Sequence, residues 1–193
     1  MNILIVNGNP DRGEPRFSDA LIDAYATAAA AAGHMVETLN VAELDFPLLR
    51  SKESWEKAAP CPDIAAAQAA LQRAQHMLLV YPLWLGDVPA LLKAFLEQLL
   101  RPGFAFAAID GKGFPQRKLR GKSVRIVVTM GMPAVIYRWY FGAHSLKSLE
   151  RNILAFCGFG PIRDTLIGNV ESGDPRKRMK ALRLLAQLGR DAR

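Results

Sequence analysis

The sequence has few of the features that mark secreted, membrane-spanning or metal-binding proteins. Only two cysteines occur among its 193 residues, Cys61 and Cys157, and their spacing fits neither a disulfide framework nor a metal-ligand pair. The start lacks a basic segment, and its apolar run is too short for a signal peptide. The longest apolar stretch, Met77 to Gly86, is well short of the roughly 18 residues that a membrane helix needs. We therefore expect a cytoplasmic protein.

Several catalytic motifs are also missing. There is no G-x-S-x-G, so hydrolases of that type are excluded, and no G-x-G-x-x-G dinucleotide fingerprint. The spacing of Gly8 and Gly13 resembles a P-loop, but Glu14 stands where the phosphate-binding lysine belongs, which excludes that nucleoside triphosphate chemistry. The three histidines lack metal-ligand spacing, and Cys157 lies among apolar residues typical of an inert core thiol. We expect no metal site.

What remains is a chain that is half hydrophobic, without internal repeats or low-complexity tracts, and long enough for a substantial core. We expect residues 1–193 to form a single domain. The net charge of +7 is unevenly divided, with −5 in residues 1–111 and +12 in residues 112–193. This basic part suits an anionic lipid, a phosphorylated cofactor or nucleic acid, but an ordinary solvated surface explains it as well. No nucleic-acid-binding module accompanies the charge, so we expect no nucleic-acid partner.

Apolar runs and helical periodicities alternate along the chain. Strands are predicted over 2–7, 35–41, 76–81, 124–130 and 162–167, with 42–62 as an irregular excursion. The first helix is predicted from an N-cap at Ser18 to about residue 32, with Gly33 as its C-cap, and the second from an N-cap at Asp63 to about residue 74. A third helix is predicted to start at Asp87 and Pro89, which suit the cap and the first turn. Two more are predicted over 145–156 and from Asp174-Pro175 onward. This alternation predicts an α/β domain around a parallel sheet, which binds ligands beyond the carboxyl ends of its strands.

The segment after the first strand, Gly8 to Ser18, leads into a helix N-terminus. Backbone amides and the helix dipole favour anions there, and Arg16 and Ser18 supply further donors. A plain strand–helix connection is an equally good interpretation of this loop.

Two more strand ends carry candidate residues. Pro82, Leu83, Trp84 and Leu85 form an apolar run that suits a flat cofactor, although such residues also cover a core. The third segment, from Thr129, is followed by Tyr137 and His144, two groups able to neutralise negative charge on a ligand. Simple packing of the tyrosine and helix capping by the histidine remain alternatives.

The blocks Tyr81–Lys93 (YPLWLGDVPALLK) and Arg101–Phe106 (RPGFAF) closely resemble the second flavin loop of the flavodoxin-like NAD(P)H:quinone oxidoreductases. These are the DT-diaphorase and modulator of drug activity B type of enzyme. The segment Ile153–Phe159 is similar too, and the resemblance extends from residue 2 to about 168. It implies a flavodoxin-like five-stranded parallel sheet of order 2-1-3-4-5 with helices on both faces.

The resemblance also implies functional residues. Those matching its flavin-binding positions are Phe17, Ser18, Pro82, Leu83, Trp84, Leu85, Thr129, Met130, Gly131, Met132 and Tyr137. We expect Asn9 and Arg16 of the first loop to bind the flavin as well, although Asn7-Gly8-Asn9 replaces a histidine of the family. Tyr137 and His144 match the catalytic pair, with His144 one residue later than in the family. Met130, Met132 and Pro133 depart from the family's Thr-Thr-Gly-Gly loop, and a degenerate pocket without flavin is one possible consequence.

The activity that the resemblance implies is two-electron, ping-pong hydride transfer from NAD(P)H through flavin to a quinone. The flavin is FAD or FMN, with FAD slightly preferred, and a homodimer completes the pocket. Two alternatives stay open. One is an azo- or nitro-compound reductase on the same scaffold. The other is a flavin-binding regulatory subunit that docks on a membrane transporter through its basic C-terminal region.

Overall fold

The computed structural model describes residues 1–11, 13–107 and 115–193 of the chain. Within them five strands form one parallel sheet of order β2-β1-β3-β4-β5. The strands are β1 (Asn2–Asn7), β2 (Met35–Asn40), β3 (His76–Pro82), β4 (Ser123–Thr129) and β5 (Ile162–Ile167). The predicted α/β class and strand order are therefore confirmed, with strand ends shifted by at most one residue.

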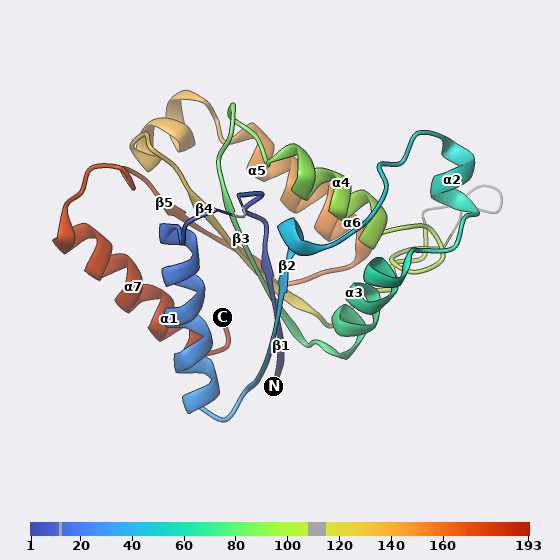
Figure 1. Cartoon of the computed structure of the whole chain (residues 1–193), viewed down its shortest axis with the longest axis horizontal. Coiled ribbons are helices and arrows are strands. Elements are labelled where there is room, and N and C mark those ends of the chain that lie inside the picture. The colour runs from blue at the N-terminus through green and yellow to red at the C-terminus, as the bar shows by residue number, and fades with distance from the viewer. Residues whose placement is uncertain (12, 108–114) are drawn as a thin grey trace.

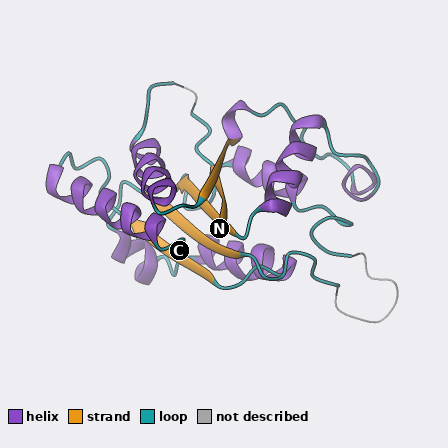
Figure 2. Ribbon diagram, turned by 90° about the horizontal axis from the view of Figure 1, so that it is seen from below, coloured by secondary structure: helices purple, strands orange, loops and turns teal. Residues whose placement is uncertain are grey.

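Helices cover both faces of this sheet (Figures 1 and 2). α1 and α7 lie side by side on one face, and α3 to α6 lie on the other. In chain order the helical segments are α1 (Phe17–Ala31), η1 (Val41–Glu43), α2 (Lys52–Glu56), α3 (Pro62–Arg73), α4 (Ala90–Leu99), η2 (Ile136–Tyr140), α5 (His144–Ser148), η3 (Leu149–Leu154), α6 (Ala155–Cys157) and α7 (Pro175–Arg190).

The core is split by the sheet into two layers. Along β1, Leu4 and Val6 point into the layer under α3 to α6, while Ile3 and Ile5 point into the layer under α1 and α7. This explains the continuous apolar runs, since parallel strands covered on both faces need apolar residues at every position. Gly189 lets α7 approach α1 closely, because a Cβ there would lie 2.2 Å from the Tyr25 carbonyl oxygen.

The predicted cap of α1 is wrong. Arg16 is the N-cap residue, and its backbone N–H donates to the Asp19 carboxylate over 2.7 Å. Ser18 instead lies inside the first turn, where its side chain is buried. At the other end Ala32 is the C-cap, and Gly33 follows it with a φ of +82°.

Other element ends also differ from the prediction. Cys61 caps α3, and Asp63 instead accepts a hydrogen bond from the Asp45 backbone over 2.7 Å. Pro89 is the N-cap of α4, which leaves Asp87 in the preceding loop. The excursion expected to be irregular contains a short helix, α2, capped by the Ser51 hydroxyl.

The helix expected over 145–156 begins at His144 and ends at Cys157, with a π-helical stretch, η3, in its middle. A second π-helical turn, η2, was not predicted. No helix in the described part of the chain is both long enough and apolar enough to span a membrane.

Acid is expected to destabilise this fold through His76. Burial first, then the charges of Arg125 and Arg163, lowers the pKa of His76 from 6.5 to about 4. Between these values the unfolded chain binds a proton that the folded chain does not. Stability should therefore fall as the pH falls from 6.5 to 4, by at most about 1.4 kcal/mol per pH unit from this group.

Denaturant unfolding of the wild type and of His76→Gln between pH 4 and pH 7.5 checks this prediction. The difference between their unfolding free energies should change across that window and stay constant above it. Parallel curves would show that His76 does not contribute, since the carboxylates are common to both proteins.

Candidate functional site

Three loops meet at the carboxyl edge of the sheet, as the sequence predicted. They follow the neighbouring strands β1, β3 and β4. The Gly8 N–H donates to the Val80 carbonyl over 2.7 Å, and the Leu83 N–H donates to the Thr129 carbonyl over 2.8 Å. These backbone hydrogen bonds tie each loop to the next strand, and together they build one continuous rim.

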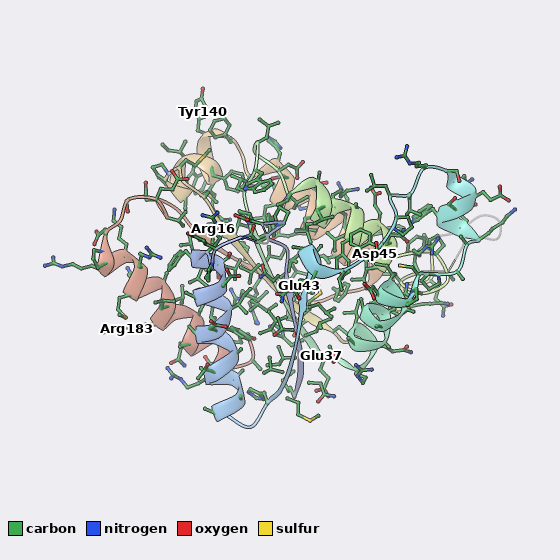
Figure 3. All side chains as sticks on the ribbon, in the orientation of Figure 1. Arg16, Glu37, Glu43, Asp45, Tyr140 and Arg183 are labelled. Carbon is green, nitrogen blue, oxygen red and sulfur yellow. The ribbon has the colours of Figure 1, made fainter. Side chains whose placement is uncertain are left out.

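The first loop is organised by its own polar side chains. The buried Asn9 amide donates to the Ser18 hydroxyl over 3.3 Å, which fixes the loop against the first turn of α1. Asp11 accepts from the Gly13 N–H over 2.9 Å and from Arg16 Nε over 2.8 Å, and these bonds lower the pKa of Asp11. The Arg16 guanidinium is thus held beside the N-terminus of α1 (Figure 3).

A second cation lies next to this helix end. The Arg178 guanidinium of α7 stacks over the Phe17 ring, 4.8 Å from its centroid. Phe17 is the first residue of α1, so this contact places Arg178 near the N-terminal amides. The positive end of the helix dipole is therefore flanked by Arg178 and by Arg16, which is ion-paired with Asp11, and this arrangement suits a phosphorylated ligand.

The second loop is a tight turn that displays apolar side chains. Trp84 and Asp87 exchange two backbone hydrogen bonds of 3.0 and 2.9 Å, and Leu85 between them has a φ of +49°. Trp84 and Leu85 are exposed, whereas Pro82 and Leu83 are half-buried. Beside this turn is a cleft of about 610 Å³ lined by Trp84, Leu85, Asp87, Val88, Pro89, Ala90, Lys93, Ser145, Ser148, Leu149 and Ile153.

The third loop presents backbone rather than bulky side chains. Thr129 and Met130 are buried, and Met130 packs into the core, so its side chain does not narrow the site. Gly131 is exposed, and the atoms nearest to a Cβ on it belong to the flexible Glu171 carboxylate, at 3.3 Å. The Met132 carbonyl accepts from the Asn169 N–H over 3.1 Å.

Gly168, which the sequence did not single out, holds this third loop in place. A Cβ on Gly168 would lie 2.4 Å from the Ala134 nitrogen and 2.7 Å from the Met132 oxygen. The end of β5 and the third loop are therefore in direct backbone contact.

Tyr137 is only 2% exposed, and its hydroxyl is locked by a partner that the sequence did not reveal. The phenol oxygen lies 2.8 Å from Ser145 Oγ and accepts from the Leu146 N–H over 3.3 Å. Ser145 in turn donates to the Gly86 carbonyl over 2.8 Å. Because Ser145 already donates to Gly86, the phenol O–H donates to Ser145. A chain of hydrogen bonds thus connects Tyr137 to the turn that carries Trp84.

His144 is exposed, in contrast to the buried Tyr137. The imidazole is exposed at the start of α5, beside Gly142. Among the described residues no hydrogen bond joins it to Tyr137. Burial first, and then the charge of Tyr137, raises the pKa of Tyr81, and burial also raises the pKa of Glu150. The interior below Tyr137 is accordingly apolar enough to disfavour negative charge.

Comparison with known proteins identifies the scaffold. The family model described as the flavodoxin-like fold matches residues 1–188. The chain belongs to this family. A relative described as an uncharacterized NAD(P)H oxidoreductase from Haemophilus influenzae is 27% identical to this flavodoxin-like protein over 191 residues, or 97% of this chain and 93% of the relative.

Two further matches extend over most of this flavodoxin-like protein. An FMN-dependent NADH:quinone oxidoreductase of Nitratidesulfovibrio vulgaris is 28% identical over 188 residues, covering 90% of this chain and 88% of the relative. The crystal structure of Smu.1420 from Streptococcus mutans superimposes with a TM-score of 0.80 at 25% identity, covering 99% of this chain and all of the other.

Proposed function

We propose that this flavodoxin-like protein is a flavin-dependent NAD(P)H:quinone oxidoreductase. The observation that carries the proposal is the rim formed by the β1, β3 and β4 loops, in which an anion-binding helix end adjoins an exposed Trp84 and a backbone-lined third loop. A phosphate at α1, a flat ring beside Trp84 and polar ring edges at Gly131 fit these three parts. The similarity to an NAD(P)H oxidoreductase of Haemophilus influenzae and to an FMN-dependent NADH:quinone oxidoreductase of Nitratidesulfovibrio vulgaris supports this assignment.

A bound flavin supplies two-electron hydride chemistry. The chain's own residues bind and orient it. Asn9, Ser18, Phe17 and Arg16 hold the phosphate end, and Pro82 to Leu85 with Thr129 to Met132 line the ring. The Tyr137 phenol would offer its proton to the site by turning from Ser145, and the exposed His144 imidazole would offer a hydrogen bond from the rim, so both would counter negative charge on a bound ring.

We further propose that NAD(P)H and quinone use the same apolar surface beside Trp84 in turn, which produces ping-pong kinetics. Initial rates measured over a grid of NADPH or NADH and a soluble quinone should give parallel double-reciprocal lines. Intersecting lines would refute the shared surface. An azo dye and a nitroaromatic measured as acceptors in the same assay test the alternative acceptor classes, and a kcat/KM above that of the quinone would reassign the substrate.

Of the two flavins we propose FAD over FMN. Arg178 stacks over Phe17 and so supplies a second guanidinium near the N-terminus of α1, which would suit the two phosphates of FAD better than the single phosphate of FMN. The Nitratidesulfovibrio relative is described as FMN-dependent, so the assignment needs a direct test. Chromatography of the flavin released from protein incubated with equal amounts of both decides it, and retention of FMN alone would overturn the preference.

A homodimer is the assembly we propose, because exposed apolar residues gather at the same rim. They are Trp84, Leu85, Val135, Ile136, Trp139, Tyr140 and Phe141, and Tyr140 projects outward from the molecule (Figure 3). Such a patch is typical of an interaction surface. Facing a second copy, it would cover the open side of the cleft.

Sedimentation velocity tests the dimer. The wild type should sediment at about twice the chain mass, and the double variant Trp139→Lys, Tyr140→Lys should sediment as a monomer. The matched control Met35→Lys, Leu48→Lys changes two other exposed apolar residues, outside this patch, and should remain a dimer. A wild-type monomer at micromolar concentration, or a dimer unaffected by the first pair, would contradict the proposal.

A further inference from the structure

The C-terminal helix α7 carries a large positive charge, of which only Arg178 serves in the proposed flavin site. Its sequence from Pro175 to Arg190 (PRKRMKALRLLAQLGR) holds six basic residues and no acidic one. The helix therefore contributes +6 of the +12 net charge of residues 112–193. It lies beside α1 at the edge of the molecule (Figure 1). Much of the uneven charge of the chain is thus concentrated on one peripheral helix.

The two sides of α7 carry different residues. The buried residues recur every four positions and face α1, and they are Ala181, Leu185 and Gly189. Arg176, Lys180 and Arg183 are spaced by four and three residues, so they share the opposite, outer side, and all three are exposed. Arg183 extends from the helix at the edge of the molecule (Figure 3). No described acidic residue forms an ion pair with any of these three cations.

The three cations surround an open hollow on this outer side, which we call the α7 hollow. It has a volume of about 540 Å³ and is lined by Pro175, Arg176, Met179, Lys180 and Arg183. Met179 is 50% exposed, and Leu184, beside the basic stripe, is 44% exposed. Aliphatic side chains displayed among cations are typical of a surface at the lipid–water interface, where alkyl groups enter the headgroup region and cations stay at the phosphates.

Nucleic acid and a second copy of the chain fit this surface less well. α7 has no aromatic residue on which a base could stack, and a phosphodiester backbone gains nothing from the exposed Met179 and Leu184. A two-fold dimer through α7 would bring the same cations face to face, where they repel one another. An anionic bilayer supplies both a negative surface potential and an interface that accepts alkyl groups.

We propose that the outer side of α7 binds the surface of a bilayer that contains anionic phospholipid, with a headgroup phosphate in the α7 hollow. Clusters of about four to eight basic residues on a helix are typical of such contacts. The 16 residues of α7 form a helix about 24 Å long, so its cations contact several neighbouring headgroups. The contact is peripheral, because the inner side of α7 stays packed on α1. It goes beyond the proposed oxidoreductase function and needs no bound flavin.

Co-sedimentation of the full-length protein with lipid vesicles tests the proposal. Vesicles of phosphatidylcholine and phosphatidylglycerol in a ratio of about two to one should bind the protein at low ionic strength, and added salt should release it. Vesicles of phosphatidylcholine alone should bind it at least about tenfold less tightly. Equal binding to both kinds of vesicle, or binding to neither, would overturn the proposal.

The triple variant Arg176→Gln, Lys180→Gln, Arg183→Gln removes the cations around the α7 hollow. It should weaken binding to the anionic vesicles by about a hundredfold, roughly fivefold for each basic residue lost. All three positions are exposed, so the variant should fold, and an unchanged melting temperature checks this. A folded triple variant that binds the vesicles like the wild type would overturn the proposal.

A matched control separates the position of the charges from their number. The variant Arg50→Gln, Arg120→Gln, Arg151→Gln lowers the net charge by the same amount at exposed positions outside α7. It should bind the anionic vesicles within about twofold of the wild type, because charges farther away than a Debye length are screened. Equal losses of affinity in the two triple variants would show that only net charge matters, and would overturn the proposal.

A second pair of variants distinguishes lipid from other polyanions. Met179→Gln, Leu184→Gln should lower the affinity for anionic vesicles at least about threefold, because less apolar surface leaves water. The control Met35→Gln, Leu48→Gln changes two exposed apolar residues outside α7 and should bind like the wild type. Unchanged vesicle affinity in the α7 pair would show that the face responds to charge alone and would overturn the assignment to lipid. A duplex DNA that binds the wild type more tightly than the anionic vesicles would reassign the face to nucleic acid.

Discussion

The variant Gly168→Ala is expected to lose at least nine-tenths of its flavin affinity. The added Cβ lies 2.4 Å from the Ala134 nitrogen and 2.7 Å from the Met132 oxygen, and both are backbone atoms that cannot rotate away. The third loop must therefore move, and the 3.1 Å hydrogen bond from Asn169 to Met132 is strained or broken. Flavin fluorescence quenching during titration measures the loss. Overpacking of this kind also costs about 1–3 kcal/mol of stability.

Ser172→Ala is the matched control. This residue lies in the same β5–α7 connection, its side chain is exposed, and the change should leave both flavin affinity and stability within experimental error. Retention of full affinity by a folded Gly168→Ala protein would show that the third loop does not contact the cofactor.

Removing the Tyr137 hydroxyl is expected to lower the rate of hydride transfer by about 10²-fold, the lower end of what positioned proton donors contribute. Phenylalanine keeps the ring in the core but deletes the group that bonds to Ser145 and Leu146. Ser145→Ala should lower the rate less, by roughly tenfold, because the phenol keeps its bond from the Leu146 backbone but loses its link to Gly86. Stopped-flow bleaching of the flavin by NADPH measures both rates.

The variant His144→Ala distinguishes the contribution of His144 to the hydride-transfer rate from that of Tyr137. The exposed imidazole should contribute less than Tyr137, roughly threefold to tenfold, because water competes for its hydrogen bonds. A Tyr137→Phe protein with wild-type hydride-transfer rates would remove the tyrosine from the mechanism. A Ser145→Ala protein that loses only stability, with unchanged rates, would make Ser145 a purely structural partner.

Much of the sheet was predictable because each strand is marked by a pattern of neighbouring residues in the sequence. Each apolar run is bounded by polar or turn residues, and β4 was predicted within one residue despite Arg125 in its third position. The rim followed from the rule that parallel sheets bind ligands at their carboxyl edge. Backbone hydrogen bonds at Gly8 and Leu83 confirm that the three loops adjoin.

The contacts between distant segments were not predictable. Ser145 lies 8 residues from Tyr137, and its bond to Gly86 spans 59 residues. Nothing in the local sequence distinguishes this serine from an ordinary helix-start residue. Gly168 is constrained by a loop more than 30 residues away in the sequence. The start of α1 was predicted wrongly because the side chain that bonds to the helix end is that of Asp19 and not that of Ser18. Such choices are made by tertiary packing and not by residue propensity.

The absorption spectrum of the purified protein, after incubation with FAD or FMN and removal of unbound flavin, tests the central claim most directly. The account predicts retained bands near about 370 and 450 nm that disappear when NADPH or NADH is added without air, and return when a quinone is added. A folded protein that retains neither flavin would contradict the proposed function.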